Sequence, residues 1–184
     1  IILTDEYILW ANLELNIKAK DLNLTKVTLL NLLIPESFPT AWELKSNQPI
    51  FDEVNFALNE VTVLKQDTSS MIRIHAYLDD EFINTYWADG LIISTPTGST
   101  GYSLSCGGPI IHPSTKNIVL TPIAPHNLNI RPLILDKGVK ISIEVEARDT
   151  QFLATLDTHS IQLNTSRRLE ISSSPYITKI CRLQ

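Results

Sequence analysis

The chain has 184 residues, which is long enough for one well-buried domain or two small ones. Hydrophobic residues make up 43% and charged residues 19%, a balance typical of globular proteins that excludes an intrinsically disordered chain. The net charge of −5 argues against a nucleic-acid partner, because such proteins normally present a basic face. The longest apolar runs are far too short to span a bilayer, so we expect no membrane partner.

Residues 1–44 show no single pattern, and their assignment to a domain is left open. The segments 7–15 and 26–38 fit two strands, or a strand and a helical turn. The first residues also lack the basic n-region of a secretory signal peptide, so they do not resemble one. The predicted β-domain starts after this segment and covers residues 45–184.

Strict alternation of apolar and polar residues dominates the rest of the chain. In the segment 71–78, Ile72, Ile74 and Ala76 share one face of an expected strand, and Arg73 and His75 share the other. The same alternation predicts further short strands, at 57–64, 81–87, 139–146, 152–156, 168–173 and 176–183.

Turn residues separate these expected strands. Asp79 and Asp80 predict a tight hairpin turn, and Gly138 marks a second turn before a strand. No long segment has a helical period of 3.6 residues, and the best helix candidate is a short one within 100–108. The sequence therefore predicts a mainly β fold: a two-layer β-sandwich-like domain with short helical turns.

The stretch ADGLIISTPTGSTGYSLSCGG, residues 88–108, holds five of the six glycines and has no Lys or Arg. A glycine-rich loop between a strand and a short helix presents backbone N–H groups, and the missing Cβ atoms let a ligand approach closely. Hydroxyls such as those of Thr100 and Ser103 bond well to phosphate, ribose or a base edge. The loop is therefore suited to a nucleotide.

Spacing alone does not select the ligand. The stretch lacks the Gly-Lys-Ser/Thr of a Walker A loop, the G-x-G-x-x-G of a dinucleotide fold and the G-x-S-x-G elbow of a serine hydrolase. An ordinary glycine-rich turn remains an alternative at this point. The two cysteines, Cys106 and Cys181, lie far apart and form no CxxC pair, which predicts reduced thiols in a cytoplasmic protein and no metal site.

The segment DGLIISTPTGSTGYSLSCGGPI, residues 89–110, resembles the signature of NAD kinases. These enzymes transfer a phosphoryl group from ATP, or in some members polyphosphate, to the 2′-hydroxyl of the adenosine ribose of NAD. Three more segments resemble family motifs in the same order: FALNEVTV, LTPIAPHNLNIRPLIL and LATLDTHS. The details are most like the bacterial members of the Bacteroidetes. The resemblance implies Mg²⁺ as the divalent cation, NAD and ATP as partners, and a cytoplasmic homodimer or homotetramer.

The resemblance also implies the residues that bind NAD. Asn59 is implied near the adenosine half and Glu60 at a ribose, where a carboxylate can accept hydrogen bonds from both hydroxyls of the diol. Asp89 is implied on the side of the nicotinamide ribose. Tyr102 offers a flat face for stacking and a hydroxyl. The remaining implied binding residues are Thr100, Gly101, Ser103 and Ser105 in the loop, the backbone of Ala124, and His159, which follows Asp157 and Thr158 in the late segment.

Two of these residues have simpler alternative interpretations, and three positions depart from the family pattern. Glu60 could decorate the solvent face of a strand, and Tyr102 could be a core aromatic. Many relatives have Ala in place of Gly101 and Gln or Asn in place of His159, and some have Arg in place of Trp87.

No Gly-Gly-Asp-Gly motif occurs in the chain. In the family this motif lies in an N-terminal α/β domain, and its Asp is implied as the general base. We therefore expect no catalytic residue among these 184, and we expect the chain to supply the NAD-binding part and to be inactive by itself. The alternative is a non-catalytic β-domain that binds a dinucleotide or forms oligomers. A serine hydrolase that uses a loop serine is a third hypothesis, disfavoured by the missing elbow.

Overall fold

The structure, a computed structural model, describes residues 37–38, 42–45, 55–66, 70–174 and 178–179. The chain divides into two compact units, residues 39–176 and residues 1–38 with 177–184. In the smaller unit, β1 (Ser37–Phe38) pairs antiparallel with β14 (Thr178–Lys179). The predicted segment 7–15 and most of 26–38 lie outside the described residues, as does most of the strand predicted at 176–183.

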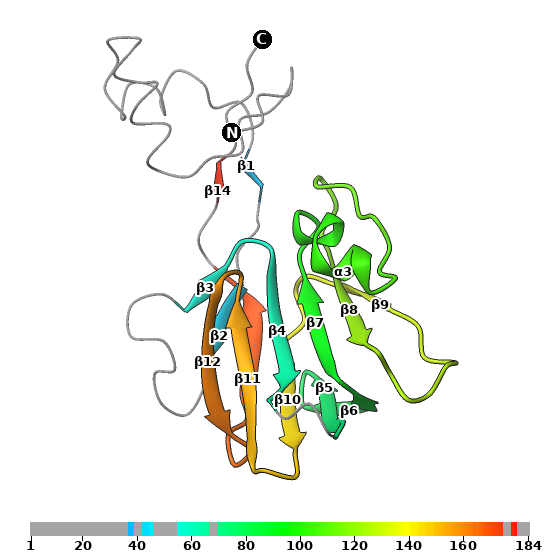
Figure 1. Ribbon diagram of the computed structural model, residues 1–184. Helices are drawn as coiled ribbons and strands as arrows, with labels where there is room; N and C mark the ends of the chain where they lie inside the picture. The colour runs from blue at the N-terminus through cyan, green and yellow to red at the C-terminus, as the bar shows by residue number, and fades with distance from the viewer. Residues whose placement is uncertain (1–36, 39–41, 46–54, 67–69, 175–177, 180–184) are drawn as a thin grey trace, which may run out of the picture. The chain divides into compact units, whose positions relative to one another are not determined.

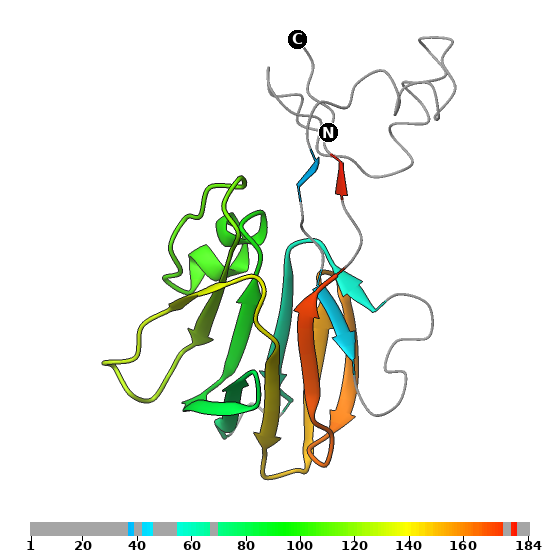
Figure 2. The ribbon, with the colours of Figure 1, turned by 180° about the vertical axis from the view of Figure 1, so that it is seen from behind.

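The described part of the larger unit contains two antiparallel six-stranded sheets. The β5 sheet, seen in front in Figure 2, has the strand order β3 (Phe56–Ala57), β2 (Trp42–Lys45), β13 (Leu169–Ser173), β10 (Ile141–Glu146), β5 (Ile72–Leu78) and β6 (Glu81–Ala88). The β4 sheet, in front in Figure 1, has the order β12 (His159–Asn164), β11 (Gln151–Leu156), β4 (Glu60–Lys65), β7 (Gly90–Ser94), β8 (Asn117–Ile123) and β9 (Leu133–Asp136). This architecture confirms the predicted mainly β sandwich.

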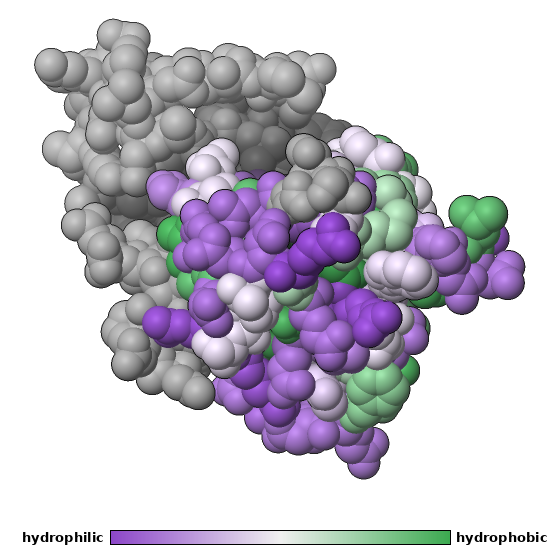
Figure 3. All heavy atoms as spheres, turned by 60° about the horizontal axis from the view of Figure 1, so that its bottom comes forward, coloured by the Kyte–Doolittle hydropathy of each residue, from purple (hydrophilic) through white to green (hydrophobic). Residues whose placement is uncertain are grey.

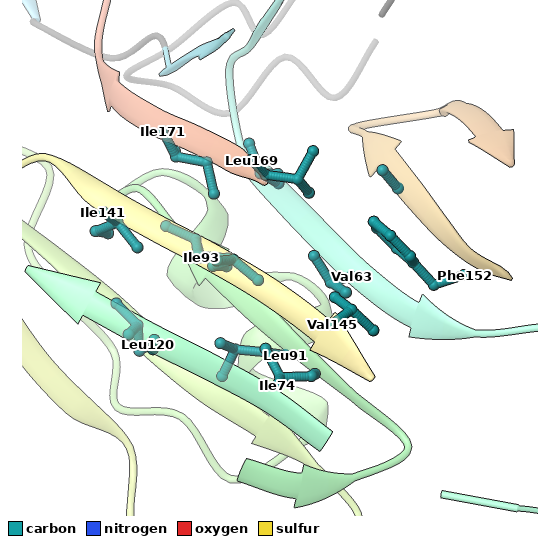
Figure 4. Close-up of a cluster of buried hydrophobic side chains, with 14 of the residues drawn as sticks. Val63, Ile74, Leu91, Ile93, Leu120, Ile141, Val145, Phe152, Leu169 and Ile171 are labelled. Carbon is teal, nitrogen blue, oxygen red and sulfur yellow. The ribbon is translucent and has the colours of Figure 1, made fainter. Parts of the chain in front are cut away.

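The hydrophobic core lies between the two sheets, because each strand turns its alternate apolar side chains toward the other sheet. Figure 4 shows these side chains meeting in the interior. The β5 sheet contributes Ile74, Ile141, Val145, Leu169 and Ile171, and the β4 sheet contributes Val63, Leu91, Ile93, Leu120 and Phe152. The strands predicted from alternation therefore place their apolar faces as expected.

The predicted hairpin between β5 and β6 is confirmed. Asp79 and Asp80 have φ values of 49° and 69°, the left-handed conformation that a type I′ turn requires at both central residues. The turn is also tied to the chain that leads into β10. Asp79 donates its backbone N–H to the carbonyl of Lys140 and accepts the Lys140 N–H on Oδ1, at 3.0 Å.

Sequence alternation did not reveal β8, β9, β12 or β2. In β8 the last six residues, Ile118–Ile123, are all buried, so the strand reads as a continuous apolar run rather than an alternating one. Strand β7 is buried throughout in the same way, and it was expected only as the strand that leads into the glycine-rich loop. Both strands are therefore buried on the outer face of the sheet as well as on the face toward the core.

Figure 3 turns the view so that the lower end of Figure 1 comes forward. The face seen there is largely hydrophilic, with scattered hydrophobic residues. No helix among the described residues is long and apolar enough to cross a membrane. In the described part of the larger unit the helical elements are single turns: a 3₁₀ turn at Gly98–Thr100 and α3 at Tyr102–Ser105. This short helix confirms the helix predicted within 100–108.

Replacing a core leucine should cost far more stability than replacing an exposed one. Leu91 is 0% exposed and Leu128 is 83% exposed. We expect Leu91→Ala to lower the free energy of unfolding by about 2–5 kcal/mol, because it leaves a cavity between the sheets. The matched control Leu128→Ala should change it by less than about 0.5 kcal/mol. Chemical denaturation of both variants measures the difference, and equal losses would contradict the assigned core.

Candidate functional site

The candidate site lies on the outer face of the β4 sheet, the face turned away from the core. Val61 and Val63 of β4 point into the core, so alternation places Glu60 and Thr62 on the outer face. In the register Glu60 lies opposite Ser94 and Thr62 lies opposite Ile92. Ile92 is fully buried, although it faces away from the core.

The segment that follows β7 covers this buried part of the outer face. Ser103 of α3 is fully buried, and its hydroxyl hydrogen-bonds the Thr121 hydroxyl of β8 at 2.8 Å. Thr121 lies opposite Ile92 in the register of β7 and β8. Figure 1 shows α3 beside the ends of these two strands. The single helical turn therefore covers Ile92, which explains why β7 and β8 are buried on both faces.

Asn59 and Glu60 lie at the start of β4 and are held there by a residue almost a hundred positions away. The Asp157 carboxylate accepts the backbone N–H of Leu58 at 2.8 Å on Oδ2, and those of Asn59 and Glu60 at 2.8 and 3.0 Å on Oδ1. In return, Asp157 donates its own N–H to the Glu60 carbonyl at 3.1 Å. Asp157 occupies the turn between β11 and β12, so this turn positions both motif residues.

Thr95 binds the same segment from the glycine-rich loop. Its N–H donates to the Asn59 carbonyl at 2.9 Å, and its hydroxyl donates to the Leu58 carbonyl at 2.9 Å. The Thr95 Oγ1 also accepts the N–H of Gly98 at 3.1 Å. The loop and the residues preceding β4 therefore form one hydrogen-bonded unit.

The glycines of the loop mainly allow close packing of the protein against itself. A Cβ atom at Gly98 would overlap the carbonyl of Asn59, and one at Gly108 would overlap the hydroxyl of Ser103. Gly107 has a φ of +81° just after α3, a conformation that suits glycine at a helix end. The expectation that the missing Cβ atoms chiefly admit a ligand is therefore wrong at these positions.

Several backbone N–H groups of the loop are also engaged within it. Ser99 donates to the carbonyl of Thr95, and Gly101 donates to that of Gly98. Gly107 and Gly108 donate to carbonyls of α3. These N–H groups are already used within the loop and are not free to bind a phosphate.

Tyr102 follows Gly101, where an added Cβ would lie 3.6 Å from Oε2 of Glu60. Its side chain is 41% exposed, so it is not a core aromatic. Burial raises the pKa of the Tyr102 hydroxyl above its usual value, and the nearby Cys106, Asp89 and Glu60 raise it further. The charges of Glu60 and Asp89, which are 29 residues apart in the sequence, thus both raise the pKa of this hydroxyl.

Glu60 carries the least satisfied acceptor of this group. Its Oε2 atom is buried and has no hydrogen-bond partner among the described residues. Burial raises the pKa of the Glu60 carboxyl above its usual value, and the charge of Asp157 raises it further. A buried carboxylate oxygen without a donor is costly to the free protein. It is a ready acceptor for a ligand hydroxyl.

Asp89 lies where the chain crosses from β6 to β7. Its carboxylate pairs with the ammonium of Lys65 at 2.6 Å. Its backbone N–H donates to the Ile123 carbonyl and its own carbonyl accepts from Lys65, both at 2.9 Å. Asp89 is thus fixed beside the end of β4 that lies away from Glu60, and its backbone hydrogen bonds extend the pairing of β7 with β4 and β8 within the β4 sheet.

Four other predicted binding residues are exposed near this face. Thr100, Gly101 and Ser105 lie in or beside the two helical turns, and a Cβ at Gly101 would sit 3.6 Å from Oε2 of Glu60. Ala124 follows β8 with a left-handed φ of 44°, which turns its backbone out of the sheet. Their roles in binding stay predictions.

Ser103 and His159 are less favourably placed for binding. The Ser103 hydroxyl is buried against Thr121, where it fastens α3 to the sheet. His159 is exposed, but it lies opposite Leu156, whose side chain belongs to the core face. Alternation therefore directs His159 to the side of the sheet opposite Glu60. Their binding roles also stay predictions, with these positions against them.

One contact near Ala124 had no sequence signal. The rings of Trp87 and His126 are stacked with centroids 4.4 Å apart and an interplanar angle of 24°. The backbone N–H of His126 also donates to the Trp87 backbone carbonyl at 2.8 Å. Two aromatic residues 39 positions apart give no local pattern, so only the fold reveals the pair.

The residues that the structure describes form no group of three or more His, Cys, Asp and Glu side chains able to hold a metal ion. Cys106 is a half-buried free thiol, and burial raises its pKa. Cys181 lies outside the described residues. The arrangement on the outer face thus offers carboxylate acceptors, hydroxyls and an exposed aromatic ring, which is the chemistry of a polar ligand with hydroxyl groups.

Comparison with protein families gives a match over residues 58–183 to the model described as the ATP-NAD kinase C-terminal domain. Two relatives named NAD kinase illustrate the sequence similarity. The protein from Cytophaga hutchinsonii is 48% identical over 79% of this chain and 50% of its own length. That from Flavobacterium johnsoniae is 52% identical over 72% of this chain and 45% of its own. The chain thus spans about half the length of these relatives.

Solved structures give a similar result. Yeast NADH kinase complexed with NADH has a TM-score of 0.68 at 27% identity, over 80% of this chain and 44% of its own. An NAD kinase from Archaeoglobus fulgidus in complex with ATP has a TM-score of 0.69 at 25% identity, over 91% of this chain and 59% of its own.

The raised pKa of Glu60 predicts a pH-dependent cost. A carboxyl with a higher pKa in the folded protein holds its proton more tightly there, so the free energy of unfolding falls as pH rises through the interval between the unfolded and folded pKa values. We expect Glu60→Gln to be more stable than the wild type at neutral pH, by a margin that shrinks toward acid pH. Denaturant titrations across this range measure the margin, and a margin independent of pH would contradict the prediction.

Proposed function

The chain belongs to the ATP-NAD kinase family through its C-terminal domain, and we propose that it supplies the NAD-binding part of an NAD kinase. The complete protein would transfer a phosphoryl group from ATP to the 2′-hydroxyl of the adenosine ribose of NAD, giving NADP. The resemblance found in the motifs is confirmed at the level of the family. The substrate, the donor and the reaction are proposals, since the chain spans about half of its relatives.

One observation carries the proposal: the buried Oε2 atom of Glu60 without a hydrogen-bond partner. A ribose presents two neighbouring hydroxyls, and a carboxylate accepts a hydrogen bond from each. Such a bond to a charged acceptor contributes about 1.5–3 kcal/mol. Ligand binding would therefore relieve the cost that burial imposes on Glu60 in the free protein.

The neighbours of Glu60 support a dinucleotide rather than a simple sugar. Tyr102 is half-exposed and offers a ring on which a base or nicotinamide can stack. We propose that the Asp89 carboxylate, which pairs with Lys65 in the free protein and whose charge raises the pKa of Tyr102, binds the second ribose. The yeast neighbour of similar fold is complexed with NADH.

We do not assign a general base to any residue of this chain. Glu60 and Asp89 are proposed to bind riboses, and Asp157 is occupied by three backbone donors. We propose that the base belongs to a Gly-Gly-Asp-Gly-containing α/β domain outside these 184 residues. Mg²⁺ is expected with the ATP phosphates, but the described residues gather no carboxylate cluster to hold it. No step of the proposal therefore uses a metal bound by this chain.

Two further parts of the proposal concern the setting of the enzyme. We propose that it acts in the cytoplasm, which fits the free thiol of Cys106. We propose a homodimer or a homotetramer, by analogy with the family alone. Light scattering on the complete protein measures the assembly. The alternative function, a β-domain that binds a dinucleotide without turning it over, predicts NAD binding and no NADP.

The test of the proposal is an assay for NADP formation by the complete protein with ATP, Mg²⁺ and NAD. We expect Glu60→Gln to weaken transition-state binding, measured from kcat/KM for NAD, by about 1.5–3 kcal/mol. Glu81→Gln, at an exposed position of β6, is the matched control and should leave kcat/KM unchanged. If Glu60→Gln also has wild-type kcat/KM, Glu60 does not hold a ribose.

Tyr102 provides a second test, based on stacking. Tyr102→Ala should reduce the affinity for NAD more than Tyr102→Phe does, because the ring supplies most of the contact area and the hydroxyl adds one polar contact. Isothermal titration with NAD compares the two dissociation constants, and thermal unfolding is recorded alongside. If Tyr102→Ala lowers the melting temperature but not the affinity, the ring has a structural role.

A further inference from the structure

We propose that Asp157 is the positioning residue of the NAD site: its carboxylate fixes the backbone at Asn59 and Glu60 so that the Glu60 side chain meets the ribose. This inference rests on the proposed function for the identity of the ligand. It assigns Asp157 no contact with the substrate.

The first support is the number of donors that converge on one carboxylate. The N–H groups of Leu58, Asn59 and Glu60 all reach Asp157, at 2.8, 2.8 and 3.0 Å. Hydrogen bonds to an ionised acceptor are shorter and stronger than neutral ones. Three consecutive residues are therefore tied to a single point, which fixes both the position and the direction of the backbone where β4 begins.

The second support is the backbone of Asp157 itself. Its φ is 49°, a left-handed conformation that Asp and Asn tolerate better than most residues. This conformation lets the same residue donate its N–H to the Glu60 carbonyl at 3.1 Å. Glu60 is thus held at both its N–H and its carbonyl, and its side chain can vary only through its own rotamers.

The third support is the electrostatic cost of the arrangement. The charge of Asp157 adds to burial in raising the pKa of Glu60, so the two carboxylates repel each other. A neutral side chain at position 157 would avoid this repulsion. Only a carboxylate, however, offers acceptors on both oxygens for three N–H groups. The need to accept these three N–H groups therefore explains why a charged carboxylate stands at position 157 despite its repulsion of Glu60.

A second turn in the chain uses the same device away from the site. Asp79 has the same φ of 49°, donates its N–H to the Lys140 carbonyl and accepts the Lys140 N–H on Oδ1 at 3.0 Å. It ties the β5–β6 turn to the chain before β10 within the β5 sheet, whereas Glu60 lies in the β4 sheet. Asp79→Asn is thus a matched control for the structural part of the effect.

The experiment compares Asp157→Asn and Asp79→Asn in the complete protein. Asn keeps the left-handed turn and one acceptor oxygen but lacks the charge and the second acceptor. We expect backbone amide exchange at residues 58–60 to accelerate in Asp157→Asn alone. We expect KM and the dissociation constant for NAD to rise about tenfold in the same variant, the effect of losing one charge-assisted hydrogen bond, with little change in KM for ATP.

A double-mutant cycle separates positioning from general destabilisation. In a Glu60→Gln background, Asp157→Asn should change NAD affinity much less than it does in the wild type, because its effect acts through Glu60. Equal effects in both backgrounds, or an equal loss of affinity in Asp79→Asn, would overturn the inference. Absence of NADP formation by the wild-type protein would overturn the proposed function instead. The coupling in NAD binding and amide exchange would still decide the role of Asp157.

Discussion

The two-residue alternation along β4 is the constraint on which both the core and the site depend. Val61 and Val63 must enter the core between the sheets, so Glu60 and Thr62 must face outward. A slip of one residue in the register would bury Glu60 in the core and expose the valines. The core therefore fixes the side of the sheet on which a ligand can bind, before any polar contact is considered.

This constraint explains the composition of the glycine-rich loop. The loop must return over the outer face of β7 and β8, close enough to roof Ile92 and to hydrogen-bond the residues before β4. Gly98 and Gly108 allow that approach, because a side chain at either position would overlap its neighbours. The hydroxyls of Thr95 and Ser103 then form the hydrogen bonds that hold the loop against the sheet. Most of the loop therefore serves packing within the protein, and only its exposed residues near Tyr102 remain available to a ligand.

The sequence predicted the architecture well where one face of a strand meets solvent. The alternating segments became β4, β5, β6, β10, β11 and β13, and the Asp79–Asp80 turn took the expected conformation. Strand β8 gave no such signal, because α3 and Thr121 bury its outer face as well. Strand β12 was missed for a different reason: most of its residues are polar and only Leu163 is buried. Alternation of apolar residues reveals a strand only when one face is buried and the other is exposed, so it detects neither β8 nor β12.

The sequence pointed to the members of the candidate site but not to the contacts that hold them. The motifs pointed to Glu60, Asp89 and Tyr102, and the charges of both carboxylates raise the pKa of Tyr102. No local pattern could show that Asp157 holds Asn59 and Glu60, because the hydrogen bonds join segments almost a hundred residues apart. Nor could it show that Ser103 is buried, since one helical turn of four residues has no measurable period.

Glu60 shows how such a site separates stability from binding. Its free oxygen is buried and lies near the charge of Asp157, so the unliganded protein carries an unfavourable group that the rest of the fold must hold in place. The backbone hydrogen bonds that Asp157 accepts and those that Thr95 donates supply that support, and Oε2 of Glu60 remains without a donor. A hydroxyl donor arriving from solvent then gains the full strength of a bond to a charged, pre-positioned acceptor, with little loss of side-chain freedom on binding.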